Sequence, residues 1–315
     1  MKKAVLIGLL VLPLSLMAQP SIGGAPTPSG TIATSVTFPV ERVQKPTHAD
    51  LYCAGFLGKE IARSNFVAGG LDSPFTTQYA SGEILYLKGS GYEVGQEYTI
   101  VRELKDPNRY ELFAGQWSAV KAAGQPYEEL ARVKIVDTRS KMAIAHVEFS
   151  CDTVLPGDYA IPFVEKSGID FHPPMRLDRF APANGQVSGR IILAKDFDSE
   201  LGNGGKVYLN IGANQGLKVG DYLLAVRSYV ATHKDSVDRL SFSAPAMEPT
   251  QKRQPSVDPL LFGKTNGPEI HVAEMPRRAV GELVIIGTTP STATGMIVYS
   301  LEPVHIGDRV ELDRQ

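Results

Sequence analysis

The chain has 315 residues, of which 43% are apolar and 21% charged, as is typical of a globular protein. Its 32 basic and 34 acidic side chains give a formal net charge of −2 at pH 7. Nucleic-acid-binding proteins gather basic residues that displace counterions from phosphate. This mildly acidic chain has no basic arm or charge run, so we expect it not to bind nucleic acid.

The first residues have the pattern of a secretory signal peptide, predicted over residues 1–18. Lys2 and Lys3 form a positive start, residues 4–18 are apolar, and Leu16-Met17-Ala18 offers a cleavage site ending in a small residue. The apolar run of about 15 residues is shorter than the roughly 20 that span a bilayer, so an uncleaved anchor is the less favoured alternative. We therefore expect a periplasmic or secreted protein that does not span the membrane after cleavage.

Residues 19–46 are rich in Pro, Gly, Ser and Thr without periodicity, which predicts a flexible leader. Beyond it, Cys53 and Cys151 are the only cysteines. In an oxidising compartment two cysteines most simply form one disulfide, and closing a loop of roughly 100 residues contributes about 4 kcal/mol in the chain-entropy model. The alternative, a reactive thiol, lacks a CxxC motif or an adjacent His or Lys.

An internal repeat organises the rest of the chain. Residues 82–87 align with residues 205–210, and residues 91–95 align with residues 216–220 after a two-residue length difference. Each copy then continues as a strand that closes on Val-Arg. Segments 55–61 and 189–194 are expected to be the opening strands of the two copies.

The second half of the repeat aligns without a gap. Residues 129–163 lie over residues 279–310 and those just after, so that Gly157-Asp158 matches Gly307-Asp308. Short β-branched and aromatic runs separated by glycine turns predict an all-β fold, with each copy a small barrel or sandwich. The predicted units are a β module at 52–164, a Pro-containing linker at 165–186 and a second β module at 187–312.

The two copies differ mainly after the Val-Arg strand. The first copy has a short insertion with three aromatic residues, Tyr110, Phe113 and Trp117, and residues 117–122 are predicted to form a helical turn. The second copy has residues 228–278 instead, a polar, Pro-bearing stretch that predicts a long loop. The three aromatic residues are candidate ligand-stacking residues, and ordinary core packing is the alternative.

The sequence contains no recognisable catalytic or metal-binding pattern. None of the six histidines has a partner His at i+4 or a nearby CxxC motif, so no zinc signature is present. The run Gly202-Asn203-Gly204-Gly205-Lys206 is too short for a phosphate loop and is predicted to be a hairpin turn. No nucleophile, base and oxyanion site occur together, so we expect no enzyme, no cofactor and no metal site.

Two motifs of the second copy resemble a module of bacterial envelope proteins. The motifs are residues 207–212 followed by 216–221, and the closing residues 306–312, whose first-copy counterpart is residues 156–159. They resemble the C-terminal domain of flagellar assembly protein T and the β-rich domains that accompany LysM peptidoglycan-binding repeats. The resemblance covers about two-thirds of the mature chain, which has no recognisable LysM repeat. It implies SH3-like small barrels with scaffold or assembly work, and it supplies no catalytic residues.

Together these observations predict a non-catalytic exported structural or adaptor protein of the cell envelope. Its expected partner is an envelope protein or peptidoglycan. The alternative is a peptidoglycan- or glycan-binding module that uses Tyr110, Phe113 and Trp117 as its stacking surface. The sequence carries no signal for the oligomeric state.

Overall fold

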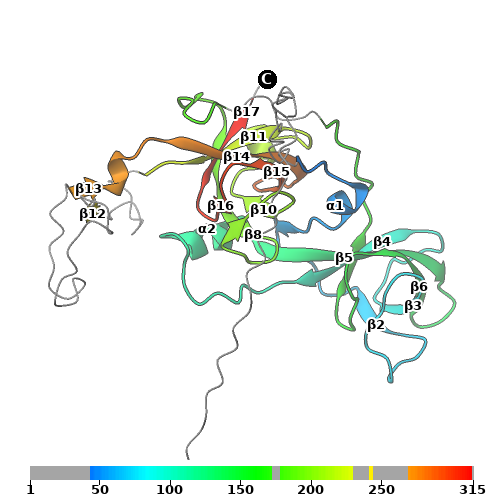
Figure 1. The fold of residues 1–315 in the computed structure, drawn as a ribbon. Helices are drawn as coiled ribbons and strands as arrows, with labels where there is room; N and C mark the ends of the chain where they lie inside the picture. The colour runs from blue at the N-terminus through cyan, green and yellow to red at the C-terminus, as the bar shows by residue number, and fades with distance from the viewer. Residues whose placement is uncertain (1–42, 172–177, 230–240, 244–268, 314–315) are drawn as a thin grey trace, which may run out of the picture. The chain divides into compact units, whose positions relative to one another are not determined.

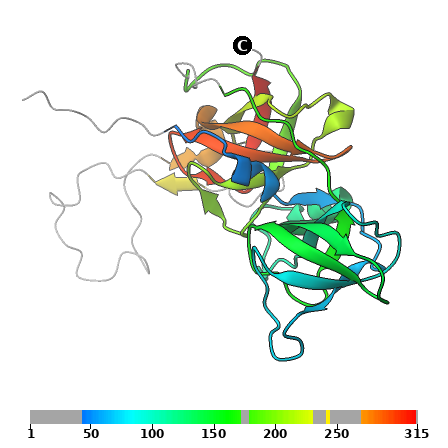
Figure 2. The ribbon, with the colours of Figure 1, turned by 90° about the vertical axis from the view of Figure 1, so that its right-hand side faces the viewer.

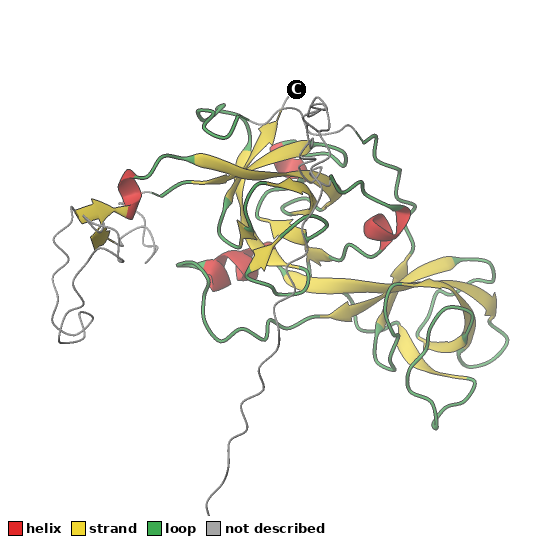
Figure 3. Cartoon of the chain, viewed as in Figure 1, coloured by secondary structure: helices red, strands yellow, loops and turns green. Residues whose placement is uncertain are grey.

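The computed structural model describes residues 43–171, 178–229, 241–243 and 269–313. The predicted signal peptide and most of the predicted leader lie outside these residues. All the described residues belong to one compact unit. Within this unit two closed six-stranded β-barrels follow one another along the chain, which confirms the predicted all-β fold of two tandem small barrels (Figures 1 and 3).

The first barrel is closed by pairing between β5 and β6, in the order β5-β4-β7-β2-β3-β6. Its strands are β2 (Phe66–Gly70), β3 (Ile84–Lys88), β4 (Glu97–Glu103), β5 (Gln125–Asp137), β6 (Ala143–Ser150) and β7 (Tyr159–Pro162). Alternate residues such as Leu85, Leu87, Val133 and Ile135 are fully buried and fill the interior.

The second barrel has the order β10-β15-β14-β11-β17-β8 and is also closed. Its strands are β8 (Ser188–Ala194), β10 (Lys206–Leu209), β11 (Tyr222–Arg227), β14 (Arg278–Thr288), β15 (Ala293–Ser300) and β17 (Arg309–Asp313). If the six strands of each barrel are numbered along the chain, equivalent strands pair with equivalent neighbours in the two barrels. The sequence repeat is therefore also a repeat of topology. Figure 2 shows the two barrels as the blue-to-green and green-to-red parts of the ribbon.

Backbone hydrogen bonds just before β3 and β10 show that the first half of the repeat should be aligned one residue differently from the sequence alignment. Gly82 N donates to Val147 O at 2.8 Å, and Gly204 N donates to Ile297 O at 2.7 Å. Since Val147 and Ile297 are equivalent in the gapless second half, Gly82 corresponds to Gly204 and not to Gly205. A slip of one residue exchanges the two faces of a strand, so sequence matching alone paired inward residues with outward ones.

The opening strand of the first barrel also differs from the prediction. Val67 N donates to Asp158 O at 2.8 Å, and Ile191 N donates to Asp308 O at 2.9 Å, so β2 is the equivalent of β8. The predicted segment contains β1 (Phe56–Gly58), which pairs with the first residues of β5. Because β5 is 13 residues long, its first residues extend beyond the barrel, and β1 pairs with them there.

In each barrel a partly buried arginine–aspartate pair joins the Val-Arg strand to the Gly-Asp turn. Arg102 donates to Asp158 through Nε at 2.9 Å and Nη2 at 2.8 Å. Arg227 donates to Asp308 in the same way, at 2.9 and 2.7 Å. The Asp158 and Asp308 side chains are nearly buried, so these bidentate pairs fasten the closing turn to the barrel wall. The sequence repeat contains both the Val-Arg and the Gly-Asp motif, but it does not show that their side chains form an ion pair.

Shorter elements surround the barrels. They are α1 (His48–Tyr52), α2 (Gln116–Ala123), the pair β9 (Glu200–Leu201) and β16 (Val304–His305), the pair β12 (Ser241–Ser243) and β13 (Glu269–His271), and 3-10 turns at Ala213–Gln215 and Val272–Glu274. The α2 helix confirms the predicted helical turn. Apart from β12 and its pairing with β13, residues 230–268 of the predicted 228–278 loop lie outside the described part of the chain.

The predicted disulfide between Cys53 and Cys151 is present, with the two Cα atoms 5.6 Å apart and 98 residues of sequence separation. It joins the end of α1 to the end of β6. The same N-terminal segment packs on the second barrel, where Leu51 and Tyr52 cover the outer face of β14 and β15. The disulfide therefore links the wall of the first barrel to a segment that covers the second.

Candidate functional site

The structure separates the three predicted stacking residues. Tyr110 and Trp117 are 81% and 52% exposed, whereas Phe113 is only 6% exposed. The Phe113 ring belongs to the core of the second barrel, where the guanidinium of Arg190 lies 3.8 Å from its centroid. Phe113 is thus a packing residue and not part of an exposed stacking surface, in line with the core-packing alternative for this residue.

Phe113 is buried because the insertion of the first barrel docks on the second. Gln116, at the start of α2 and itself buried, accepts a hydrogen bond from Leu112 N at 2.7 Å and donates one to Ile192 O at 3.1 Å. Residues Ala119, Val120 and Ala123 of α2 pack against the same core. One face of α2 is therefore committed to the second barrel, and its other side remains available.

Trp117 stands on that other side. The Glu111 carboxylate accepts hydrogen bonds from Gly115 N at 3.1 Å and from Trp117 N at 2.9 Å, which satisfies free N–H groups at the start of α2. The position of Trp117 is thus held by the backbone, while its indole is half exposed. Among the described residues, the indole Nε1 has no hydrogen-bond partner.

Trp117 lines a hollow of about 480 Å³, which we call the Trp117 hollow. Its exposed rim carries Lys105 and Lys121, with Asp106 beside them. Its less exposed lining is apolar and comes from both barrels: Leu104, Val120, Pro126 and Leu193. A volume of this size is within the range of small-molecule sites, and a mainly apolar lining with a few polar groups is their usual composition.

A second pocket, of about 490 Å³, lies at the ion pair of Glu129 and Lys166. Lys166 Nζ donates to Glu129 Oε1 at 2.6 Å and Oε2 at 2.8 Å and to Leu51 O at 2.8 Å, which uses its three hydrogens. Glu129 also accepts from Gly55 N at 3.1 Å. Burial raises the pKa of Glu129, and the charge and hydrogen bonds of Lys166 oppose that rise. This pair locks the linker and α1 to β5, so its charges are not available to a ligand.

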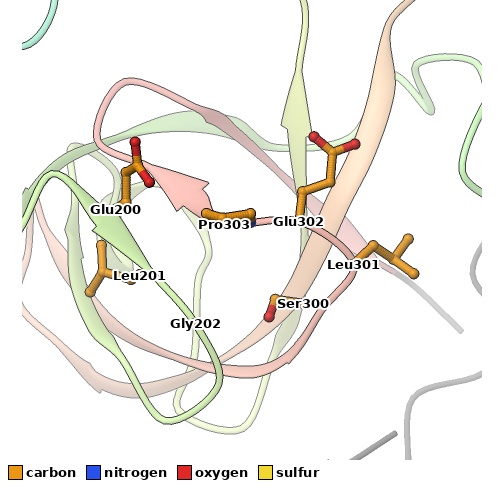
Figure 4. A pocket seen from close by; sticks show the side chains of 7 residues that line it. All are labelled: Glu200, Leu201, Gly202, Ser300, Leu301, Glu302 and Pro303. Atoms are coloured by element: carbon orange, nitrogen blue, oxygen red, sulfur yellow. The ribbon is translucent and has the colours of Figure 1, made fainter. Parts of the chain in front are cut away.

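A third pocket, of about 430 Å³, lies between the turn after β9 and the turn after β15 (Figure 4). Glu200 and Glu302 stand at its two sides in the figure. The Glu302 carboxylate pairs with three arginines: Arg278 at 2.9 Å, Arg227 at 3.4 Å and Arg179. Since Arg179 belongs to the linker, this network fastens the linker to the second barrel, and Glu302 is a structural residue.

The Trp117 hollow is therefore the candidate functional site, because its aromatic and cationic groups are not used within the described chain. Sequence reasoning singled out Trp117 but missed the two lysines. Lys121 follows Trp117 by four residues, so the predicted helical turn already places it on the same face. Lys105 lies 12 residues before Trp117, and only the fold brings it to the hollow. Within the described ranges, no group of three or more His, Cys, Asp or Glu residues is placed to hold a metal ion.

Of the helices in the described part of the chain, none is long and apolar enough to cross a membrane. In comparisons with known proteins, no family model matches the chain and no curated protein shows significant similarity to it.

Proposed function

We propose that this chain is a non-catalytic, exported structural or adaptor protein of the bacterial cell envelope. The observation that carries the proposal is the interlocking of its two barrels. A side chain from the insertion of the first barrel, Phe113, fills the core of the second, and the α1 segment is tied by a disulfide to the first while it covers the second. An adaptor that holds partners at a set spacing needs a junction of this kind, without a free hinge.

The proposed location rests on two independent features. The N-terminal residues have the pattern of a cleavable signal peptide, and the disulfide is of a type that persists in oxidising compartments such as the periplasm. The resemblance of the glycine motifs to the C-terminal domain of flagellar assembly protein T and to LysM-associated domains belongs to the same proposal. It supports envelope scaffolding as the kind of work done.

In vivo crosslinking followed by capture of the tagged protein tests the proposal. We expect the wild-type chain to be recovered from the periplasm in one discrete complex with a macromolecular partner at fixed stoichiometry. A tagged variant without residues 2–18 is the matched control, because it stays in the cytoplasm and reports non-specific capture. Recovery of the wild-type chain only as a freely diffusing monomer, or from the cytoplasm, would refute the proposal.

A second candidate function is glycan binding, and the half-exposed Trp117 over an unfilled hollow is the observation that favours it. An exposed indole offers a flat apolar face and one N–H donor, which suits a sugar ring that has both C–H faces and hydroxyl groups. Sedimentation with purified peptidoglycan tests this function. Trp117→Ala should abolish co-sedimentation, whereas Tyr110→Ala, which removes an exposed aromatic ring outside the hollow, should not.

A further inference from the structure

The Trp117 hollow combines three kinds of surface that point to one class of ligand. Its apolar lining and the indole provide area for a flat, partly apolar ring. Its rim carries two ammonium groups, Lys105 and Lys121, and neither has an ion-pair or hydrogen-bond partner among the described residues. An acidic group on a ligand would pair with these two ammonium groups.

The lysines of the hollow differ from others on the same chain. Lys166 is paired with Glu129, Lys206 with Asp50, and Lys195 lies 3.7 Å from Glu128. Asp106, the one carboxylate among the described residues that line the hollow, accepts a hydrogen bond from Asn108 N at 2.8 Å. The hollow therefore has a net positive rim, and in a partly enclosed site such a rim attracts anions more strongly than isolated surface lysines do.

We propose that the Trp117 hollow binds a carboxylate-bearing saccharide, with a sugar ring stacked on the Trp117 indole and its carboxylate between Lys105 and Lys121. This inference rests on the glycan-binding candidate and adds the chemical class of the ligand. An acidic peptide would also complement the lysines. The saccharide is favoured because one side of the hollow is a flat indole whose Nε1–H has no partner among the described residues, which matches a ring carrying hydroxyl acceptors.

The chain carries its own reporter for the test, because Trp117 is its only tryptophan. Tryptophan emission of the mature protein therefore reads out this hollow alone. We would titrate it with a disaccharide containing N-acetylmuramic acid, which bears a carboxylate, and with the N-acetylglucosamine disaccharide, which is neutral. The expected result is a saturable emission change with the acidic sugar at an affinity about fivefold to tenfold higher than with the neutral one, falling toward the neutral value as salt is added.

Substitution of the two rim lysines distinguishes the proposed acidic ligand class from glycan binding in general. Lys105→Gln with Lys121→Gln should lower the affinity for the acidic disaccharide to that for the neutral one and leave the neutral affinity unchanged. Lys134→Gln, which removes an exposed lysine from the wall of the first barrel, is the matched control and should change neither.

Equal affinities for the two sugars, unaffected by the lysine substitutions, would overturn the acidic ligand class while glycan binding stands. No emission change with either sugar would overturn both for this hollow. A saturable change with an acidic aromatic peptide, but with neither sugar, would overturn the saccharide and identify a peptide site.

Discussion

The buried carboxyl group of Glu282 should give the stability an unusual pH dependence. The residue lies on β14 and is 1% exposed, and neither of its carboxyl oxygens has a hydrogen-bond partner in the described part of the chain. Alternation along the strand places it on the same face as Val284, which packs in the covered outer face of the second barrel. Burial, with a smaller contribution from the charge of Asp313, raises the pKa of Glu282 to about 7.

The sign of the effect follows from proton binding. The folded chain keeps the Glu282 proton up to about pH 7, while the unfolded chain releases it near the ordinary value of 4.5. Folding is therefore favoured most below pH 4.5, and this contribution to the free energy of unfolding is lost as the pH rises from there to above 7. The rise in the pKa of Glu282 from 4.5 to about 7 corresponds to a loss of about 3 kcal/mol in the free energy of unfolding once the pH is above 7.

Glu282→Gln removes the titration and keeps the shape. We expect the variant to match the wild type at pH 4 and to exceed its free energy of unfolding by about 3 kcal/mol at pH 8, measured by urea denaturation at one-unit steps of pH. Using the difference between the two proteins cancels the titration of all other groups. A difference that stays constant from pH 4 to pH 8 would refute the reasoning.

A second carboxylate on the same barrel provides a control of opposite sign. Glu311 is nearly as buried but pairs with Arg277 at 2.5 and 2.9 Å, and this hydrogen-bonded pair lowers its pKa. The stability that Glu311 contributes is present above its ordinary pKa and lost as the pH falls through its lowered value. Glu311→Gln should therefore be less stable than the wild type at neutral pH, and the deficit should shrink in acid.

Three further predictions concern the contacts that hold the barrels. Asp308→Asn breaks the nearly buried bidentate pair with Arg227 and should lower the free energy of unfolding by about 3 kcal/mol, seen as an earlier urea midpoint; an unchanged midpoint would mean that the pair contributes nothing net. Phe113→Ala should cost about 3–5 kcal/mol, because the ring fills the second core, whereas Tyr110→Ala should stay within about 0.5 kcal/mol; equal effects in thermal melts would contradict the burial of Phe113. Reduction of the disulfide should cost about 4 kcal/mol, because it closes 98 residues, and a denaturation curve that does not move under reducing conditions would disprove its stabilising role.

Much of the fold was predictable because its signals are local. Gly95 and its repeat partner Gly220 have φ of 89° and 94°, and Gly157 and Gly307 have φ of 99° and 107°. These left-handed values strongly favour glycine, so the turns left a visible repeat in the sequence. The disulfide was predictable from the cysteine count together with the expected signal peptide, and the α2 turn from its run of helix-forming residues.

The errors arose where partners are distant in sequence. One slipped residue in the first half of the repeat was invisible without the hydrogen bonds of Gly82 and Gly204, because both neighbouring positions offered glycine. The arginine–aspartate pairs join residues 56 and 81 positions apart, and no local pattern shows that they meet. In the Trp117 hollow, the aromatic residue was a candidate from the sequence, but Lys105 and Leu193 of the second barrel join it only by folding.

The glycine-marked repeat is enough to show that the chain forms two copies of one β unit. What covers each copy becomes visible only in the folded chain. On the outer face of the second barrel, Val284 and Met296 are buried under α1 and the linker, whereas the equivalent residues of the first barrel, Lys134 and His146, remain accessible to solvent. The side chains differ accordingly: the covered face of the second barrel is apolar and is removed from water, whereas the polar face of the first barrel stays hydrated. Which segment provides the cover depends on contacts across more than a hundred residues, and local patterns do not specify those.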